Sequence, residues 1–183
     1  MIFDFSRIKN SKNLLAFSGG VDSSALFFLL LNHKIDFDIA IVNYNTREQS
    51  KDEIDYALNL AKEYKKEIFI KDVKLENSSN FEKNARDIRY GFFEQIIKEN
   101  SYETLITAHQ LNDRLEWFLM QLSKGAGLVE LFGIREFEEK KDYKIFRPLL
   151  NVSKDELENY LKENKIKYFI DSSNIDEKYK RNY

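Results

Sequence analysis

Short apolar runs alternate along the chain with longer stretches in which apolar residues recur at helical spacing. The runs predict strands and the longer stretches predict amphipathic helices. We predict five strands: Asn13–Phe17, Phe37–Val42, Ile68–Val73, Thr104–Thr107 and Lys144–Phe146. We predict five helices: Ser23–Asn32, Gln49–Tyr64, Asn80–Glu99, Leu111–Ser123 and Lys154–Asn164. This alternation is typical of an α/β fold, so we expect a doubly wound, mostly parallel five-stranded sheet with helices on both faces.

The loops after Phe17, Val42 and Thr107 follow three of the predicted strands. Right-handed crossovers would place these loops at the carboxyl edge of one sheet. Open α/β folds bind their ligands at that edge, at the point where the strand order reverses. We therefore expect the functional residues to gather there.

Residues Ser18–Ser24 read Ser-Gly-Gly-Val-Asp-Ser-Ser and join the first predicted strand to the first predicted helix. Free backbone N–H groups and the positive end of the helix dipole suit an anion at such a junction. Gly19 and Gly20 let a phosphate approach the backbone, and the serine hydroxyls add donors. Asp22 either caps the helix or holds a metal ion that bridges phosphates. An ordinary serine-capped turn is the alternative, but seven residues of this composition favour nucleotide binding.

The segment lacks the Gly-x-x-x-x-Gly-Lys-Ser/Thr pattern of a Walker A loop. Ser-Gly-Gly-x-Asp-Ser-Ser instead resembles the signature of the PP-loop ATP pyrophosphatases. This resemblance implies cleavage of ATP between the α and β phosphates, with AMP and pyrophosphate as products. It further implies an ATP site with a bound Mg²⁺, for which Asp22 is the metal ligand. The nucleotide-binding residues would be Ser18, Gly19, Gly20, Val21, Asp22, Ser23 and Ser24.

A second polar cluster, Thr107–Trp117, begins where the fourth predicted strand ends and continues into an amphipathic helix. On a helix, His109 and Asp113 are four apart, and Asp113 and Glu116 are three apart, so we expect these side chains to share one face. Two carboxylates there would suit an ammonium group. A capped helix with acidic residues in its first turns is the alternative. The nucleotide loop at the same sheet edge favours the functional interpretation.

The pattern Thr-Ala-His-x-x-x-Asp-x-x-Glu resembles the tRNA(Ile)-lysidine synthetase branch of the PP-loop family. Further matches extend over nearly the whole chain: Ala85, Arg86, Arg89, Tyr90, Phe93, Lys124–Leu128, Arg147, Pro148, Leu149, Leu150, Asp171, Ser173, Asn174, Asp176, Tyr179, Arg181 and Asn182. Some positions depart from the pattern. Asn112, Arg114 and Trp117 stand where the family usually has Asp, Gln and Thr, and Asn43–Thr46 replaces a His-His-Gly-Leu-like run.

This resemblance implies an ATP-dependent ligase that adenylates C2 of the first anticodon cytidine of the CAU tRNA(Ile), after which free lysine displaces AMP to give lysidine. It implies that Asp113 and Glu116 bind the lysine ammonium groups. The catalytic residues would be Asp22, His109 and Arg86, with His109 near the α-phosphate or the reacting base.

Three further arginines are candidates for contact with phosphate or with the tRNA: Arg89, Arg147 and Arg181. Surface salt bridges are the alternative for these side chains. The family's closing motif carries another arginine, which would lie beyond Tyr183. We therefore expect residues 1–183 to be the catalytic domain of a truncated chain that lacks a C-terminal tRNA-binding region.

The composition suits one domain, because 183 residues with 43% hydrophobic content bury a substantial core. Cysteine is absent, which excludes disulfides, iron–sulfur clusters and sulfur transfer through an enzyme thiol. A net charge of −2 argues against a uniformly basic nucleic-acid surface. No stretch has the length of a membrane span and the first residues do not resemble a signal peptide, so we expect a cytoplasmic protein with no membrane partner.

The residues leave two other functions open. One is a different PP-loop ligase, in which ammonia attacks an adenylate to form an amide. The other is a module that binds ATP without catalysis. The oligomeric state is not determined by the sequence, and a homodimer is among the candidates.

Overall fold

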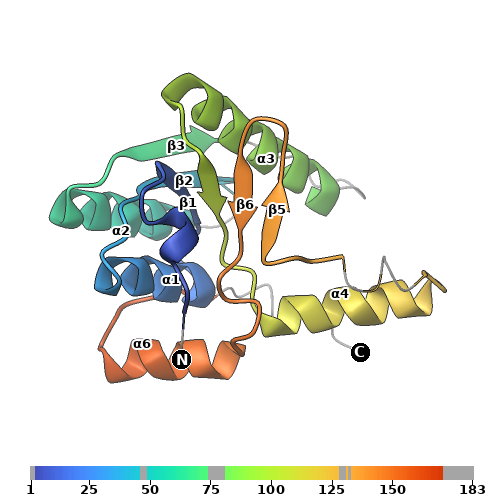
Figure 1. The fold of residues 1–183 in the computed structure, drawn as a ribbon. Helices are drawn as coiled ribbons and strands as arrows, with labels where there is room; N and C mark the ends of the chain where they lie inside the picture. The colour runs from blue at the N-terminus through green and yellow to red at the C-terminus, as the bar shows by residue number, and fades with distance from the viewer. Residues whose placement is uncertain (1–2, 46–48, 74–80, 128–130, 132, 171–183) are drawn as a thin grey trace.

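The computed structural model describes residues 3–45, 49–73, 81–127, 131 and 133–170. Within these residues the chain forms a six-stranded sheet with the strand order β3-β2-β1-β4-β6-β5 (Figure 1). The strands are β1 (Asn13–Phe17), β2 (Asp38–Asn43), β3 (Ile68–Asp72), β4 (Thr104–Ile106), β5 (Phe137–Glu139) and β6 (Lys144–Phe146). Neighbouring strands pair in parallel, except that β5 runs antiparallel to β6.

Helices cover both faces of the sheet, as predicted (Figure 1). They are η1 (Ser6–Ile8), α1 (Val21–Asn32), α2 (Gln49–Tyr64), α3 (Phe81–Asn100), α4 (Leu111–Ser123) and α6 (Lys154–Glu163). Side chains of β1 alternate between the two faces, as the pleat of a strand requires. Leu15 and Phe17 belong to a core with α1, α2 and α6, whereas Leu14 belongs to a second core with α3. The predicted doubly wound α/β fold is therefore confirmed.

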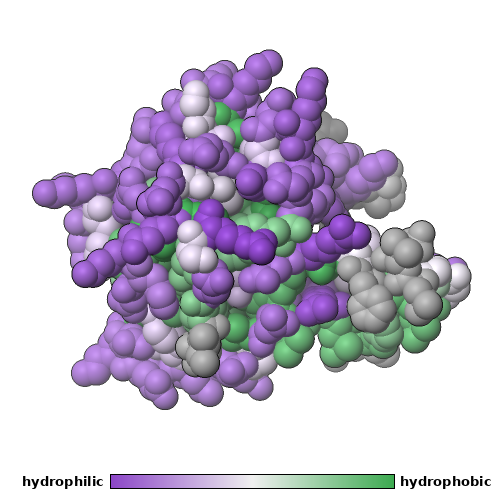
Figure 2. Space-filling view, in the orientation of Figure 1, coloured by the Kyte–Doolittle hydropathy of each residue, from purple (hydrophilic) through white to green (hydrophobic). Residues whose placement is uncertain are grey.

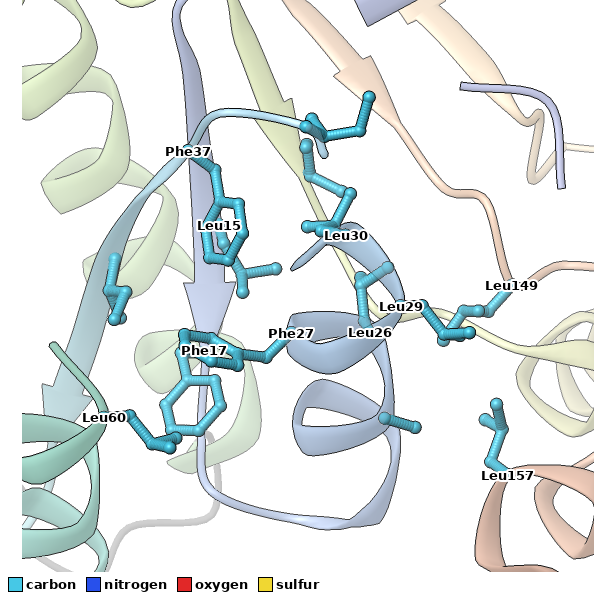
Figure 3. Close-up of a cluster of buried hydrophobic side chains, with 14 of the residues drawn as sticks. Leu15, Phe17, Leu26, Phe27, Leu29, Leu30, Phe37, Leu60, Leu149 and Leu157 are labelled. Atoms are coloured by element: carbon cyan, nitrogen blue, oxygen red, sulfur yellow. The ribbon is translucent and has the colours of Figure 1, made fainter. Parts of the chain in front are cut away.

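Aromatic packing holds α1 against the sheet (Figure 3). The Phe27 ring of α1 is fully buried, and its centroid lies 5.2 Å from that of Phe37 and 5.9 Å from that of Phe17, the last residue of β1. Buried aromatic pairs in such edge-to-face arrangements add to the stability given by area burial alone. These contacts fix α1 against the end of β1, and so they position the connection between the two elements.

The sequence predicts five strands, and β5 is the strand that this prediction misses. Its residues, Phe-Glu-Glu, contain a single apolar side chain, so no strand pattern is present. The strand forms because β6 offers it an antiparallel partner and because the Phe137 ring stacks on the ring of Phe146, with centroids 4.3 Å apart. The short 3₁₀ helix η1 has no counterpart in the prediction either.

Helix α4 projects from the body of the molecule (Figure 1), and none of its side chains is buried. Several of its apolar residues are exposed, among them Leu115, Leu119 and Leu122, and Figure 2 shows apolar surface over the part of the molecule where α4 lies. In the described part of the chain, no helix combines the length and the apolar character that a membrane span needs.

Candidate functional site at the carboxyl edge of the sheet

A cavity of about 590 Å³ opens at the carboxyl edge of the sheet. The ends of three strands reach it, with Phe17 of β1, Asn43 of β2 and, directly after β4, Thr107. The phosphate loop, Ser18–Ser24, supplies another part of its wall. The strand order reverses between β1 and β4, which is where open α/β sheets bind ligands. The predicted convergence of these loops is therefore confirmed.

Hydrogen bonds between neighbouring residues define the shape of the phosphate loop. Gly19 has a φ of +77°, a left-handed conformation that favours glycine. The Ser18 backbone N–H donates to Ser23 Oγ at 3.2 Å, and Ser24 Oγ donates to the Gly19 carbonyl oxygen at 3.2 Å. Gly20 is the N-cap residue of α1, and among the described residues no side chain caps this helix. The first turn of α1 thus offers its backbone N–H groups and its dipole to an anion.

Most of the predicted nucleotide-binding residues line the cavity: Ser18, Gly20, Val21, Asp22 and Ser23. Gly19 and Ser24 are not among the lining residues. The hydrogen bond between them stabilises the turn. Since Gly20 occupies the N-cap position, Asp22 does not cap the helix. The metal-binding alternative for Asp22 stays a prediction.

Asp22 lies in the first turn of α1, and its Oδ1 atom is buried without a hydrogen-bond partner among the described residues. Burial raises the pKa of its carboxyl group to about 6; the negative charge of Asp113 adds to this, Lys154 opposes it, and Glu158 adds a further small increase. A buried, unpartnered carboxylate oxygen beside a phosphate site fits Mg²⁺, which binds through one or two carboxylates together with phosphate oxygens and water. The described residues contain no cluster of three His, Cys, Asp or Glu ligands. Asp22 would accordingly share the ion with the nucleotide.

The raised pKa of Asp22 predicts a pH dependence of stability. A group whose pKa is higher in the folded state stabilises the fold below its unfolded pKa, 3.8, and loses that contribution as the pH rises through about 6. Asp22→Asn should therefore increase the free energy of unfolding by about 1–2 kcal/mol at pH 8, with partial solvent screening taken into account, and should change it little at pH 4. Urea unfolding without nucleotide or Mg²⁺ measures both values. An equal effect at the two pH values would contradict this prediction.

His109 lies in the loop between β4 and α4, directly before the helix rather than on it. Its Nδ1 atom forms a hydrogen bond with Thr107 Oγ1 at 2.9 Å. Burial lowers its pKa to about 4; the negative Asp113 opposes this, and the positive charges of Arg147, Arg89 and Arg86 add to it. The imidazole is therefore neutral at physiological pH, and Nε2 is the ring nitrogen left for a ligand.

Asp113 lines the cavity and also stabilises the start of α4. Its Oδ2 atom accepts the Gln110 backbone N–H at 2.9 Å, and the Gln110 side chain accepts the Asn112 backbone N–H at 2.6 Å. This is a capping box, so the capping alternative holds for Asp113 without removing it from the cavity. Glu116 is exposed and is not among the lining residues. The structure thus brings His109 and Asp113 to one cavity, but it does not bring Glu116 there.

The predicted arginines occupy different environments. Arg89 of α3 lines the cavity, whereas Arg86 is exposed, with its guanidinium 5.6 Å from the centre of the Tyr90 ring. Arg147 is buried and donates to the Arg135 carbonyl oxygen at 2.9 Å and to Glu138 Oε2 at 2.8 Å. For Arg147 the salt-bridge alternative is therefore realised. The remaining candidate, residue 181, lies outside the described residues.

The lining residues that the sequence interpretation missed include Lys154, Glu158 and Phe169. Lys154 and Glu158 lie one turn apart on α6, and the charge of each acts on the Asp22 carboxyl group. The capping box Ser-x-x-Glu before α6 indicates where this helix starts. No pattern in the sequence indicates that its first turn reaches the phosphate loop, because that contact depends on the packing of α6 against α1.

Comparison with known proteins identifies the family. Residues 3–183 match the family model described as PP-loop domain. A tRNA(Ile)-lysidine synthase of Campylobacter jejuni (strain RM1221) is 56% identical over 176 residues, which are 96% of this chain and 54% of the relative. One of Helicobacter pylori (strain ATCC 700392 / 26695) is 53% identical over 175 residues, or 96% of this chain and 51% of the relative. The chain spans about half the length of these curated relatives.

Solved structures with low sequence identity share the fold. The U34-tRNA thiolase NcsA from Methanococcus maripaludis, with its 4Fe-4S cluster, matches with a TM-score of 0.76 at 23% identity, covering 91% of this chain and 61% of that one. The NH3-dependent NAD synthetase from Campylobacter jejuni matches with a TM-score of 0.56 at 18% identity, covering 88% of this chain and 68% of that one. Together with the family match over nearly its whole length, the sheet order and the phosphate loop mean that this chain belongs to the PP-loop domain family.

Proposed function

We propose that the protein containing this chain ligates free lysine to C2 of the first anticodon cytidine of the CAU tRNA(Ile), with ATP as the second substrate and lysidine, AMP and pyrophosphate as products. The observation that carries the proposal is the phosphate loop, in which Asp22 has a buried Oδ1 without a hydrogen-bond partner in the described part of the chain. The relatives named tRNA(Ile)-lysidine synthase support the choice of tRNA and of the product.

In the first step, the C2 oxygen of cytidine attacks the α-phosphorus of ATP, a new P–O bond forms, and the bond to the β-phosphate breaks. The phosphate loop would bind the β and γ phosphates through the first turn of α1, where N–H groups and dipole favour negative charge. Mg²⁺ bound by Asp22 and the phosphates would neutralise charge on the departing pyrophosphate. The arginine and lysine side chains among the described lining residues are Arg89 and Lys154. Their positive charges would also stabilise the negative charge on the departing pyrophosphate.

In the second step, the amine of lysine attacks C2, the bond between C2 and the AMP oxygen breaks, and the attacking nitrogen loses a proton. The adenylated oxygen leaves as part of AMP, which is a better leaving group than the original C2 oxygen. Asp113 lines the cavity, and its Oδ2 atom caps α4. Its other carboxylate oxygen would bind an ammonium group of lysine. A role for Glu116 stays a prediction.

His109 would contribute a hydrogen bond rather than a charge. Its pKa of about 4 makes the imidazole a weak base at physiological pH, and the bond to Thr107 fixes the ring orientation. We propose that Nε2 contacts the α-phosphate or the reacting base. Arg86 and Arg89 lie one turn apart on α3 and would act on the same region, since the charges of both reach His109.

The test is incubation of the protein with ATP, Mg²⁺, labelled lysine and a tRNA(Ile) transcript bearing CAU. We expect label on the RNA in an amount equal to the AMP formed, and none on a matched transcript with uridine in place of the first anticodon cytidine. AMP formation with ammonia and without tRNA would favour the amide-forming alternative. ATP binding without any AMP would favour the non-catalytic module.

A further inference from the structure

The segment after α6, residues 167–170, runs beside the phosphate loop. The Phe169 backbone N–H donates to the Gly19 carbonyl oxygen at 2.9 Å, and Phe169 forms a parallel β-bridge with Gly20. The Gly19 carbonyl also accepts the hydroxyl of Ser24 at 3.2 Å. In a trans peptide the carbonyl and the following N–H point in opposite directions. The two donors therefore set the orientation of the Gly20 N–H in the anion-binding turn.

The same segment is tied to α2. The Tyr56 hydroxyl donates to the Lys167 carbonyl oxygen at 2.6 Å, and the rings of Tyr56 and Phe169 lie 5.7 Å apart. The Lys167 ammonium lies 4.9 Å from the centre of the Phe169 ring and 5.8 Å from that of Tyr56. These contacts fix the position of Phe169 relative to a helix that packs in the main core.

The Phe169 ring lies next to Gly19, in the direction that a side chain at that position would take. A Cβ atom placed on Gly19 would lie 3.5 Å from Phe169 Cδ2 and 3.6 Å from Glu53 Cβ, so these two side chains leave room for a glycine and little more. Phe169 is half-buried, and both it and Ile170 line the cavity. Residues 167–170 thus contact the phosphate loop and also form part of the cavity wall.

We propose that Phe169 is a positioning residue, which holds the phosphate loop in the conformation that binds the triphosphate; the inference rests on the proposed use of ATP at this loop. The ring restricts the left-handed Gly19 turn, and the backbone N–H orients its carbonyl. A loop that is already in its bound conformation loses less freedom when the ligand binds. Phe169 would therefore contribute to nucleotide affinity while forming no bond that breaks or forms in the reaction.

The proposal predicts a selective loss of triphosphate affinity in Phe169→Ala. Titration calorimetry with Mg²⁺ and AMPCPP, an ATP analogue whose α,β-methylene bridge resists cleavage between the α and β phosphates, on the 183-residue chain, should show an increase in Kd of about tenfold. Phe169→Leu, which retains an apolar cover over Gly19, should restore the Kd to within about threefold of the wild type. Tyr56→Phe removes one hydroxyl bond of the anchor and should raise the Kd about threefold.

Two variants of residues outside the cavity lining serve as controls. Phe92→Ala removes a half-buried ring on α3, and Tyr160→Phe removes one hydroxyl hydrogen bond, the one to Asn32. Both should lower Tm without changing the Kd by more than about twofold. In turnover, Phe169→Ala should raise the KM for ATP and leave the KM for lysine unchanged, a split that a general loss of stability does not produce.

An unchanged Kd in Phe169→Ala, or an equal increase in Phe92→Ala, would overturn the inference. Because AMPCPP binding needs neither tRNA nor lysine, the outcome is independent of lysidine formation. A wild type that binds AMPCPP but makes no lysidine would refute the proposed function and leave the positioning role in place. A wild-type chain that does not bind AMPCPP would refute both.

Discussion

Replacement of Asp22 by Asn is expected to slow tRNA- and lysine-dependent pyrophosphate release by about 10³-fold, because a carboxylate that binds a phosphate-bridging cation supplies several kcal/mol of charge stabilisation. The amide keeps the size of the side chain but loses its charge. The buried Oδ1 atom has no hydrogen-bond partner among the described residues, so the exchange breaks no hydrogen bond at that atom. Single-turnover release of pyrophosphate measures the effect, and the fold is checked through Tm.

A matched control is Asp55→Asn, which removes an exposed carboxylate from α2 outside the cavity. It should leave the rate within about twofold of the wild type, as is usual for surface substitutions. Loss of the Asp22 charge should have two effects in Asp22→Asn. The variant should be more stable at pH 8 and nearly inactive. Retention of more than a tenth of the wild-type rate would contradict the metal-binding role.

Replacement of Asp113 by Asn is expected to raise the KM for lysine by about 10- to 100-fold, as for the loss of a hydrogen bond between charged groups, and to change the KM for ATP by less than about threefold. The Asn side chain still presents an oxygen to the Gln110 N–H, so the capping bond of α4 is retained. Steady-state kinetics with each substrate varied in turn measure both constants.

Glu116→Gln tests whether the ammonium group of lysine binds in the cavity or on the exposed face of α4. Because Glu116 is exposed and outside the lining of the cavity, its effect on the KM for lysine should be smaller than that of Asp113→Asn. The reverse order would place the ammonium site at Glu116, and equal loss of lysine and ATP affinity in Asp113→Asn would refute its assignment to lysine.

Elements whose pattern is local were predicted well from the sequence. The bounds of β1, α2, α4 and β6 agree with the prediction, because apolar periodicity and capping signals lie within each segment. Strand β5 was missed because it depends on β6 and on the stacking of Phe137 against Phe146, which no local pattern encodes. The two-residue difference at the start of α1 matters more, since it places Asp22 in the first turn rather than at the cap.

The site residues that could be predicted belong to short sequence motifs, whereas those that were missed reach the site through the packing of distant segments. The phosphate loop was predictable because its glycines and serines are consecutive, and His109 and Asp113 were found because a strand end precedes them. Lys154 and Phe169 reach the loop only through the packing of α6 and of the segment that follows it. Arg147 was predicted as a candidate for contact with phosphate or with the tRNA, and in the structure its guanidinium donates to the Arg135 carbonyl oxygen and to Glu138.

The proposed reaction requires that the phosphate loop binds the β and γ phosphates and leaves the α-phosphorus open to attack. The most direct measurement uses ATP labelled at the α-phosphorus, with Mg²⁺, lysine and the CAU tRNA(Ile), and separates the labelled products by chromatography. We expect the label in AMP, with one labelled AMP molecule for each lysine joined to the RNA. Label in ADP would mean cleavage between the β and γ phosphates and would contradict it.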